Sequence, residues 1–421
     1  MPARLLLAAT ASAAVVATTL GTLGALATPA AAASIREPTL IGRAVLPALT
    51  FAPGPVSGTA IGSGPFNGIT PPFASQPVQG FSALIEDGKR GRYLALSDNG
   101  YGARTNSADF LLRATRLRAD LRAGTVSVRP RQLSFSDPRG LAGKALTRPD
   151  RLLTGADFDP ESIRRVADGT YWVGEEFGPS LLHFSATGEL LQAPVRFPVP
   201  ARLAAAARGR DVVASPDAPE VLAGSGVANL PASRGIEGMA LSTDGRTLYP
   251  SLEGALVDDP DQARRVVYAF DVASASFRPQ TADLRLSAPG NAIGDLTAAG
   301  KDSLIVIERD NAQGTAAVTK RLLLVDLSTF AGTLPTRPLV DLLDVADPRG
   351  ISGPAEPGTV GLGSRFGLPF QTIESVLVQD PRTLVVANDN NFPFSSGRRP
   401  GSPDDNEIIK IRLPAPLPRG H

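Results

Sequence analysis

Short apolar runs alternate with tight turns along this chain, and one arrangement of them recurs after residue 79. Each repeat begins with a small or acidic residue, follows one apolar run to a turn, and returns through a second apolar run that ends in acids or amides. Turns such as Asp87-Gly88, Asp168-Gly169 and Asp244-Gly245 between two such runs predict β-hairpins. The five predicted hairpins span residues 80–100, 158–176, 235–253, 292–310 and 372–391.

Further alternating runs follow the hairpins and predict a third and a fourth strand in each repeat. Leu181–Phe184 and Glu189–Leu191 follow the second hairpin, and Val266–Phe270 and Ser276–Phe277 follow the third. Repeated units of four antiparallel strands predict an all-β fold, a single β-propeller. Five blades can be counted, and a sixth would need strands within residues 51–79 or 200–234.

The fifth repeat has a third strand at Glu407–Ile411 but no later run that could serve as its fourth. We expect the alternating segment Thr39–Leu46 to fill this place. That pairing would close the ring and remove an open sheet edge.

Acidic residues recur where the predicted first strands begin and where the second strands end. These two positions lie at the same end of an antiparallel pair, and the first strands of a propeller line its central channel. We therefore expect acids from all repeats to gather at one mouth of the channel, on the face that also carries the longer loops. The inner set is Asp159, Glu161, Glu237, Asp295 and Glu374, and the outer set is Asp98, Glu175, Glu253, Glu308 and Asp389.

The composition narrows the chemistry available to these acids. Among 421 residues there is no cysteine and only two histidines, which excludes disulfides, thiolate metal sites and cysteine nucleophiles. The formal net charge of +1 gives no basic field, so no nucleic-acid partner is expected. Crowded carboxylates without histidine or cysteine favour a hard cation, Ca²⁺ before Mg²⁺. The expected metal ligands are Asp159, Glu161, Glu175, Glu237, Asp295, Glu308, Glu374 and Asp389; the alternative is that acids at strand ends are solvated or cap nearby amides.

Basic residues in the predicted loops are candidates for contact with an anionic substrate. Arg104, Arg234, Arg309 and Lys320 fall on the loops that open on the acidic face. The alternative is that they pair with the acids, and Arg309 between two acidic residues could form a structural ion pair. Ser82 occupies the acidic position in the first repeat, but no histidine base accompanies it, so a hydrogen-bonding role is expected.

The N-terminal segment predicts export. No charged residue lies between Arg4 and Arg36, and the segment ends in an alanine-rich stretch typical of signal-peptidase cleavage. We predict a signal peptide over residues 1–33 and one propeller domain over 34–421; an uncleaved membrane anchor is the alternative. The mature protein is expected to be secreted or in the cell envelope, monomeric and without stable membrane insertion.

Several motifs taken together resemble the phytase-like domain family, which is described as having esterase-like activity of the phytase type. They are Leu96–Gly100, Asp159–Ser162, Gly235–Ala240, Ile307–Asp310 and Asn388–Phe392, within a resemblance that spans roughly residues 38–412. The resemblance implies a secreted, Ca²⁺-dependent propeller that acts on phosphate monoesters or related esters. Characterised β-propeller phytases have six blades, and here five are counted.

The sequence thus predicts a metal-dependent hydrolase of small anionic esters, with Glu237 and Asp159 as its catalytic residues. One alternative is a lactonase or sugar-ester hydrolase on the same metal-centred propeller. Another is a non-catalytic envelope-binding propeller in which the metal stabilises the ring.

Overall fold

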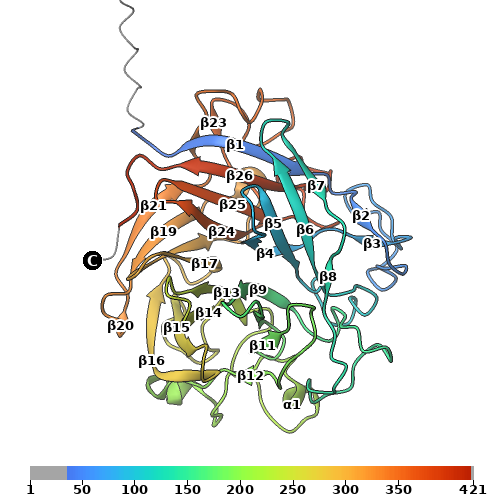
Figure 1. Cartoon of the computed structure of the whole chain (residues 1–421), viewed down its shortest axis with the longest axis vertical. Helices are drawn as coiled ribbons and strands as arrows, with labels where there is room; N and C mark the ends of the chain where they lie inside the picture. The colour runs from blue at the N-terminus through green and yellow to red at the C-terminus, as the bar shows by residue number, and fades with distance from the viewer. Residues whose placement is uncertain (1–35, 419–421) are drawn as a thin grey trace, which may run out of the picture. The chain divides into compact units, whose positions relative to one another are not determined.

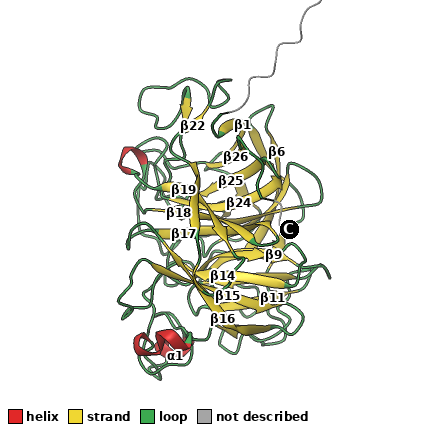
Figure 2. Cartoon of the chain, turned by 90° about the vertical axis from the view of Figure 1, so that its left-hand side faces the viewer, coloured by secondary structure: helices red, strands yellow, loops and turns green. Residues whose placement is uncertain are grey.

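The computed structural model describes residues 36–418, which are almost entirely strands and loops. The signal peptide predicted for residues 1–33 lies outside the described residues. The helical elements are short, and α1 lies in a loop beside the strands (Figure 2). They are η1 (Ala201–Ala206), α1 (Pro219–Leu222) and η2 (Gly314–Ala316). Within residues 36–418, no helix has the length and apolar character needed to cross a bilayer.

The strands form successive antiparallel units of four. The first consists of β4 (Phe81–Glu86), β5 (Arg92–Ser97), β6 (Arg113–Asp120) and β7 (Thr125–Val128). The second consists of β9 (Pro160–Arg165), β10 (Tyr171–Glu175), β11 (Ser180–Phe184) and β12 (Val195–Arg196). The third consists of β13 (Ile236–Leu241), β14 (Thr247–Leu252), β15 (Arg264–Asp271) and β16 (Ser276–Arg285). The fourth consists of β17 (Ala292–Gly300), β18 (Ser303–Arg309), β19 (Lys320–Asp326) and β21 (Thr336–Asp341).

The fifth unit joins the two ends of the described chain, as predicted. It consists of β24 (Thr372–Asp380), β25 (Thr383–Asp389), β26 (Asn406–Arg412) and β1 (Thr39–Leu46). β1 runs antiparallel to β26, with Thr39 opposite Arg412 and Leu46 opposite Asn406. At this seam Glu407, which is 1% exposed, accepts hydrogen bonds from Arg43 at 2.6 and 2.8 Å and from Arg398 at 2.9 Å.

The first strands of the five units surround a common centre, and each contacts the next in the cyclic order β4, β9, β13, β17, β24 (Figure 1). The fold is therefore a β-propeller. Of the segments considered for a sixth blade, residues 51–79 contribute the two-stranded sheet of β2 (Phe51–Ala52) and β3 (Gln76–Pro77), and residues 200–234 contain η1 and α1. The remaining short strands add to the edges of these sheets: β8 (Leu133–Ser134), β20 (Gly332–Thr333), β22 (Val345–Ala346) and β23 (Arg365–Phe366).

One predicted strand is wrong. Glu189–Leu191 does not form the fourth strand of the second unit; β12 pairs with β11 instead. Leu190 and Glu189 make only isolated bridges, to Phe184 and to Ser136. The run therefore has an apolar pattern because Leu190 is buried, although it makes no continuous ladder.

Buried apolar side chains fill the spaces between neighbouring units. Strand β25 shows the principle, because its successive side chains point to opposite faces of the sheet. Leu384 and Val386 pack toward the fourth unit, whereas Val385 and Ala387 pack toward the first. Each sheet is thus buried on both faces, which explains why its strands read as nearly continuous apolar runs.

Candidate active site

A register irregularity near the start of every first strand turns one residue out of the regular pairing. In β9, Glu161 is passed over between Pro160 and Ser162, and Glu237 in β13 and Glu374 in β24 are passed over in the same way. Ser82 has this position in β4, and β17 has a shift between Ile293 and Leu296. Such bulges redirect a side chain, and here they direct three glutamates into the central opening.

A second set of side chains comes from equivalent positions at the ends of the second strands. Each of these residues lies opposite the residue that begins or directly precedes the first strand of its unit: Gly80, Asp159, Gly235, Ala292 or Thr372. The five equivalent residues are Asp98, Glu176, Glu253, Arg309 and Asp389. Four units therefore contribute an acid at this position, and the fourth contributes an arginine.

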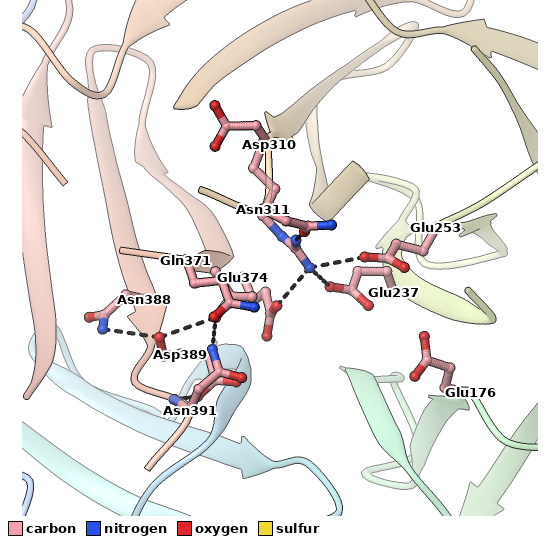
Figure 3. A network of polar contacts seen from close by, with 12 residues as sticks. Glu176, Glu237, Glu253, Asp310, Asn311, Gln371, Glu374, Asn388, Asp389 and Asn391 are labelled. Carbon is pink, nitrogen blue, oxygen red and sulfur yellow. Dashed lines mark hydrogen bonds and ion pairs between the residues drawn. The ribbon is translucent and has the colours of Figure 1, made fainter. Parts of the chain in front are cut away.

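Together the two sets line a cavity of about 280 Å³ at the centre of the loop-bearing face, the acid-lined cavity. Figure 3 shows part of it, with the carboxyl groups of Glu237, Glu253 and Glu374 joined by dashed lines to one nitrogen. That nitrogen is Nη2 of Arg309. Asn99, Gln371, Thr372 and Asn391 add polar groups to the wall. The carboxyl groups of the lining are those of Asp98, Asp159, Glu161, Glu176, Glu237, Glu253, Glu374 and Asp389.

All of these acids except the half-buried Asp98 are almost completely buried, and most have raised pKa values. Burial is the main cause in each case, because it disfavours the charged form. For Asp98, Glu161, Glu176 and Glu374, repulsion from neighbouring carboxylates adds to burial and the pKa lies well above its usual value. The pKa of Glu237 is raised to about 8, and those of Asp159 and Asp389 to about 6.

Arg309 is the cationic side chain in the described lining of this cavity. Its Nη2 donates to Glu237, Glu253 and Glu374 at 2.9, 3.0 and 3.1 Å, and its Nη1 donates to Asn311 at 2.7 Å. The side chain is 5% exposed. Burial alone would lower the pKa of Arg309, but the three glutamates outweigh it and raise the pKa.

Three groups of acids within the cavity have a geometry that could hold a metal ion. In each, one carboxylate oxygen per residue lies within 4.8 Å of the others. The groups are Asp159, Glu161 and Glu176; Glu161, Glu237 and Glu374; and Glu176, Glu237 and Glu253. Hard oxygen donors crowded in this way suit Ca²⁺ or Mg²⁺.

Of the sequence-predicted metal ligands, the structure brings Asp159, Glu161, Glu237, Glu374 and Asp389 together in the cavity. Glu175, Asp295 and Glu308 lie outside its lining. Glu175 accepts hydrogen bonds from the backbone N–H groups of Phe177 and Gly178, within a separate pocket.

Asp295 and Glu308 are held by other partners. Asp295 pairs with Arg164 at 2.8 Å and accepts from the Val376 N–H at 3.1 Å, so it links inner strands of three units. Glu308 accepts from Ser287 and pairs with Arg321 at 2.7 Å. Neither side chain reaches the cavity, because each lies one residue away from the position in its strand whose equivalents in other units point into the cavity.

The predicted substrate-binding cations are also mostly engaged elsewhere. Arg104 lies 3.8 Å from Asp217, and Arg234 pairs with Glu253 at 2.8 Å; neither lines the cavity. Lys320 is fully buried, and its Nζ donates to the carbonyl oxygens of Asp310 and Gln371 at 2.6 and 2.8 Å and lies 2.9 Å from the Asp310 carboxylate.

Comparison with known proteins identifies the family of this chain. A model of the phytase-like family, described as esterase-like activity of phytase, matches residues 76–392, about three quarters of the chain. The chain belongs to the phytase-like family.

Individual similarities to other proteins are weaker. An uncharacterised secreted protein of Arthroderma benhamiae is 32% identical over 118 residues, a match that covers 26% of this chain and only 22% of that protein. A putative gluconolactonase has 13% identity and a TM-score of 0.30, covering 80% of this chain and 75% of that one. The PQQ-bound aldose sugar dehydrogenase of Streptomyces coelicolor has 12% identity and a TM-score of 0.37, covering 89% and 99%.

Sequence reasoning missed Glu176 as a site residue of this phytase-like protein and assigned its neighbour Glu175 instead. The signal that distinguishes them is the pairing register: Glu176 donates its N–H to the Asp159 carbonyl, just as Asp98 and Glu253 donate to Gly80 and Gly235.

Proposed function

We propose that this phytase-like protein is a metal-dependent ester hydrolase that acts in the acid-lined cavity. The observation that carries the proposal is the concentration of eight carboxyl groups, seven of them buried, around one guanidinium. Carboxylates at this density either hold protons or bind a cation. The family description, esterase-like activity of phytase, supports hydrolysis as the reaction class.

The residues present fit a hard divalent cation, and Ca²⁺ in particular. Every side chain that could serve as a ligand offers oxygen, and Asp159, Glu161 and Glu176 place three carboxylate oxygens within 4.8 Å of one another. When bound, the ion would supply Lewis-acid chemistry and an activated water.

The chain itself supplies groups that hold and move protons. Glu237 receives a hydrogen bond from Arg309 at 2.9 Å and shares another with Glu374, so it can take up a proton from an attacking water at its carboxylate. Asp159 accepts from the N–H and the Nδ2 of Asn99 at 3.0 and 2.6 Å, which fixes its orientation toward the cavity.

The charge of the cavity favours an uncharged ester over a phosphate monoester. Besides the bound ion, a phosphate group needs cationic donors from the chain. Within the described lining these are limited to Arg309, whose Nη groups already donate to Glu237, Glu253, Glu374 and Asn311. A lactone or a sugar ester carries no net charge. Its hydroxyl groups can donate to the carboxylates, and a protonated carboxyl group or the bound ion can contact its carbonyl oxygen. We therefore place this class of ester before phosphate monoesters.

We expect Glu237→Gln to lower the rate of ester hydrolysis by about 100-fold, because a general base typically contributes at least that factor. Initial rates should be measured in Ca²⁺ with a lactone and an aryl phosphate in parallel. Glu189→Gln is the control, since Glu189 is exposed and lies at an isolated bridge outside the cavity. If the wild type hydrolyses neither substrate, the proposal that the protein is an ester hydrolase is refuted.

Ca²⁺ should also stabilise the folded protein. At 100 times its dissociation constant, an ion that binds only the native state adds about 2.7 kcal/mol to the free energy of unfolding. Urea unfolding with Ca²⁺ and with a chelator measures this difference, and Glu161→Gln should reduce it. A stabilisation by Ca²⁺ without hydrolysis of any ester would favour the binding propeller instead.

Export remains part of the proposal. The matched relative from Arthroderma benhamiae is named a secreted protein, which supports the location expected from residues 1–33. Cell fractionation of the native host, with the cleaved N-terminus read by mass spectrometry, would test it.

A further inference from the structure

Arg309 lies inside the acid-lined cavity in the position where a cation would be expected. Its guanidinium is held by Glu237, Glu253 and Glu374, which come from β13, from the residue after β14 and from β24 (Figure 3). Three carboxylates from two other units therefore converge on a single nitrogen, Nη2. A metal ion at this place would be coordinated by the same three carboxylates. Here the guanidinium of Arg309, a cation that belongs to the chain, binds them instead.

The local structure of the fourth unit explains why an arginine can take this place. Arg309 ends β18 at the position that is acidic in the other four units. The same unit has no acid in its bulge that reaches the cavity, because a Cβ at Gly294 would lie 2.0 Å from the Ile373 carbonyl oxygen and Asp295 is paired with Arg164. The fourth unit thus contributes a positive charge and no negative charge to the opening.

Arg309 separates the three acids that it binds from the group Asp159, Glu161 and Glu176, while Asp98 and Asp389 belong to neither set. The groups Glu161–Glu237–Glu374 and Glu176–Glu237–Glu253 each include residues bonded to Arg309. The group Asp159–Glu161–Glu176 includes none of them. Glu176 lines the cavity and accepts a hydrogen bond from the Gly235 N–H at 3.2 Å. In Figure 3 no hydrogen bond or ion pair joins it to the other labelled residues.

We propose that Arg309 is a built-in cation that occupies the Glu237, Glu253 and Glu374 part of the cavity, so that one divalent ion binds at Asp159, Glu161 and Glu176. The proposal rests on the proposed function for the presence of that ion. It adds the position and the number of ions, and it assigns Arg309 to positioning the acids rather than to substrate. It also leaves Glu237 free of the metal and able to accept a proton.

Arg309→Met tests this assignment, because methionine keeps much of the side-chain volume and removes the charge. Isothermal titration of the full chain with Ca²⁺, with ions counted by native mass spectrometry, should give one ion for the wild type and two for Arg309→Met. Arg309→Lys keeps a cation and should retain one ion. Two ions on the wild type, or an equal number on wild type and Arg309→Met, would overturn the proposal.

If Arg309→Met binds Ca²⁺ but the wild type does not, the metal-dependent function is refuted. That result would still support the role of Arg309 as a built-in cation. If Arg309→Met fails to fold, Glu176→Gln and Glu253→Gln form a matched pair at equivalent positions of neighbouring units. Glu176→Gln should weaken Ca²⁺ binding at least about tenfold, and Glu253→Gln should leave the affinity close to that of the wild type. Equal losses in both variants would contradict the division of the cavity.

Discussion

Glu407→Gln is expected to destabilise the protein by about 3–5 kcal/mol at neutral pH, because it leaves the guanidinium groups of the buried Arg398 and the partly buried Arg43 without their carboxylate. Glu407 is 1% exposed and accepts from Arg43 and Arg398 across the seam between β1 and β26. Urea unfolding of wild type and variant measures the loss. Glu356→Gln is the matched control, since it breaks an exposed pair with Arg399 and should cost less than about 1 kcal/mol.

The cost of Glu407→Gln should depend on pH in a defined direction. Burial alone would raise the pKa of Glu407, but Arg398 and Arg43 outweigh it and lower the pKa from 4.5 to about 2. The stabilisation by this carboxylate is therefore complete above about pH 4.5 and is lost as the pH falls toward 2. The difference in unfolding free energy between wild type and variant should shrink over that interval. A difference that stays constant from pH 7 to pH 2.5 would contradict the ion-pair explanation.

Lys320→Met should lower the free energy of unfolding by about 3 kcal/mol and leave the KM for substrate unchanged. The buried ammonium of Lys320 binds two carbonyl oxygens and the Asp310 carboxylate, and methionine would leave all three without that donor. Lys89→Met, at an exposed position, is the control for removal of a lysine charge. A raised KM with unchanged stability would instead favour the substrate-binding role expected from the sequence.

The strands could be predicted because the information for them is local. Alternation of apolar residues and turns such as Asp168-Gly169 define a hairpin within about twenty residues. The closure of the ring by Thr39–Leu46 could be predicted because the fifth repeat lacked a fourth strand and this segment belonged to no other repeat. Glu189–Leu191 was assigned wrongly, since a buried leucine gives the same pattern whether or not its backbone joins a ladder.

The site was less predictable because the direction of each side chain depends on bulges and on partners far away in the chain. A shift of one residue exchanges the two faces of a strand, and this separates Glu176 from Glu175 and Arg309 from Glu308. Asp295 is directed away by Arg164, which lies 131 residues earlier. Neither effect leaves a mark in the local sequence.

The pairing of β1 with β26 has a consequence for how the molecule forms. Arg43 and Glu407 are separated by 364 positions, so β1 must wait for β26, which is synthesised much later. Until residue 412 has left the ribosome, the fifth sheet lacks two strands, and its neighbours on both sides are exposed. The ring can close only after this point, and a nascent chain interrupted before it would present unpaired strand edges to chaperones and proteases.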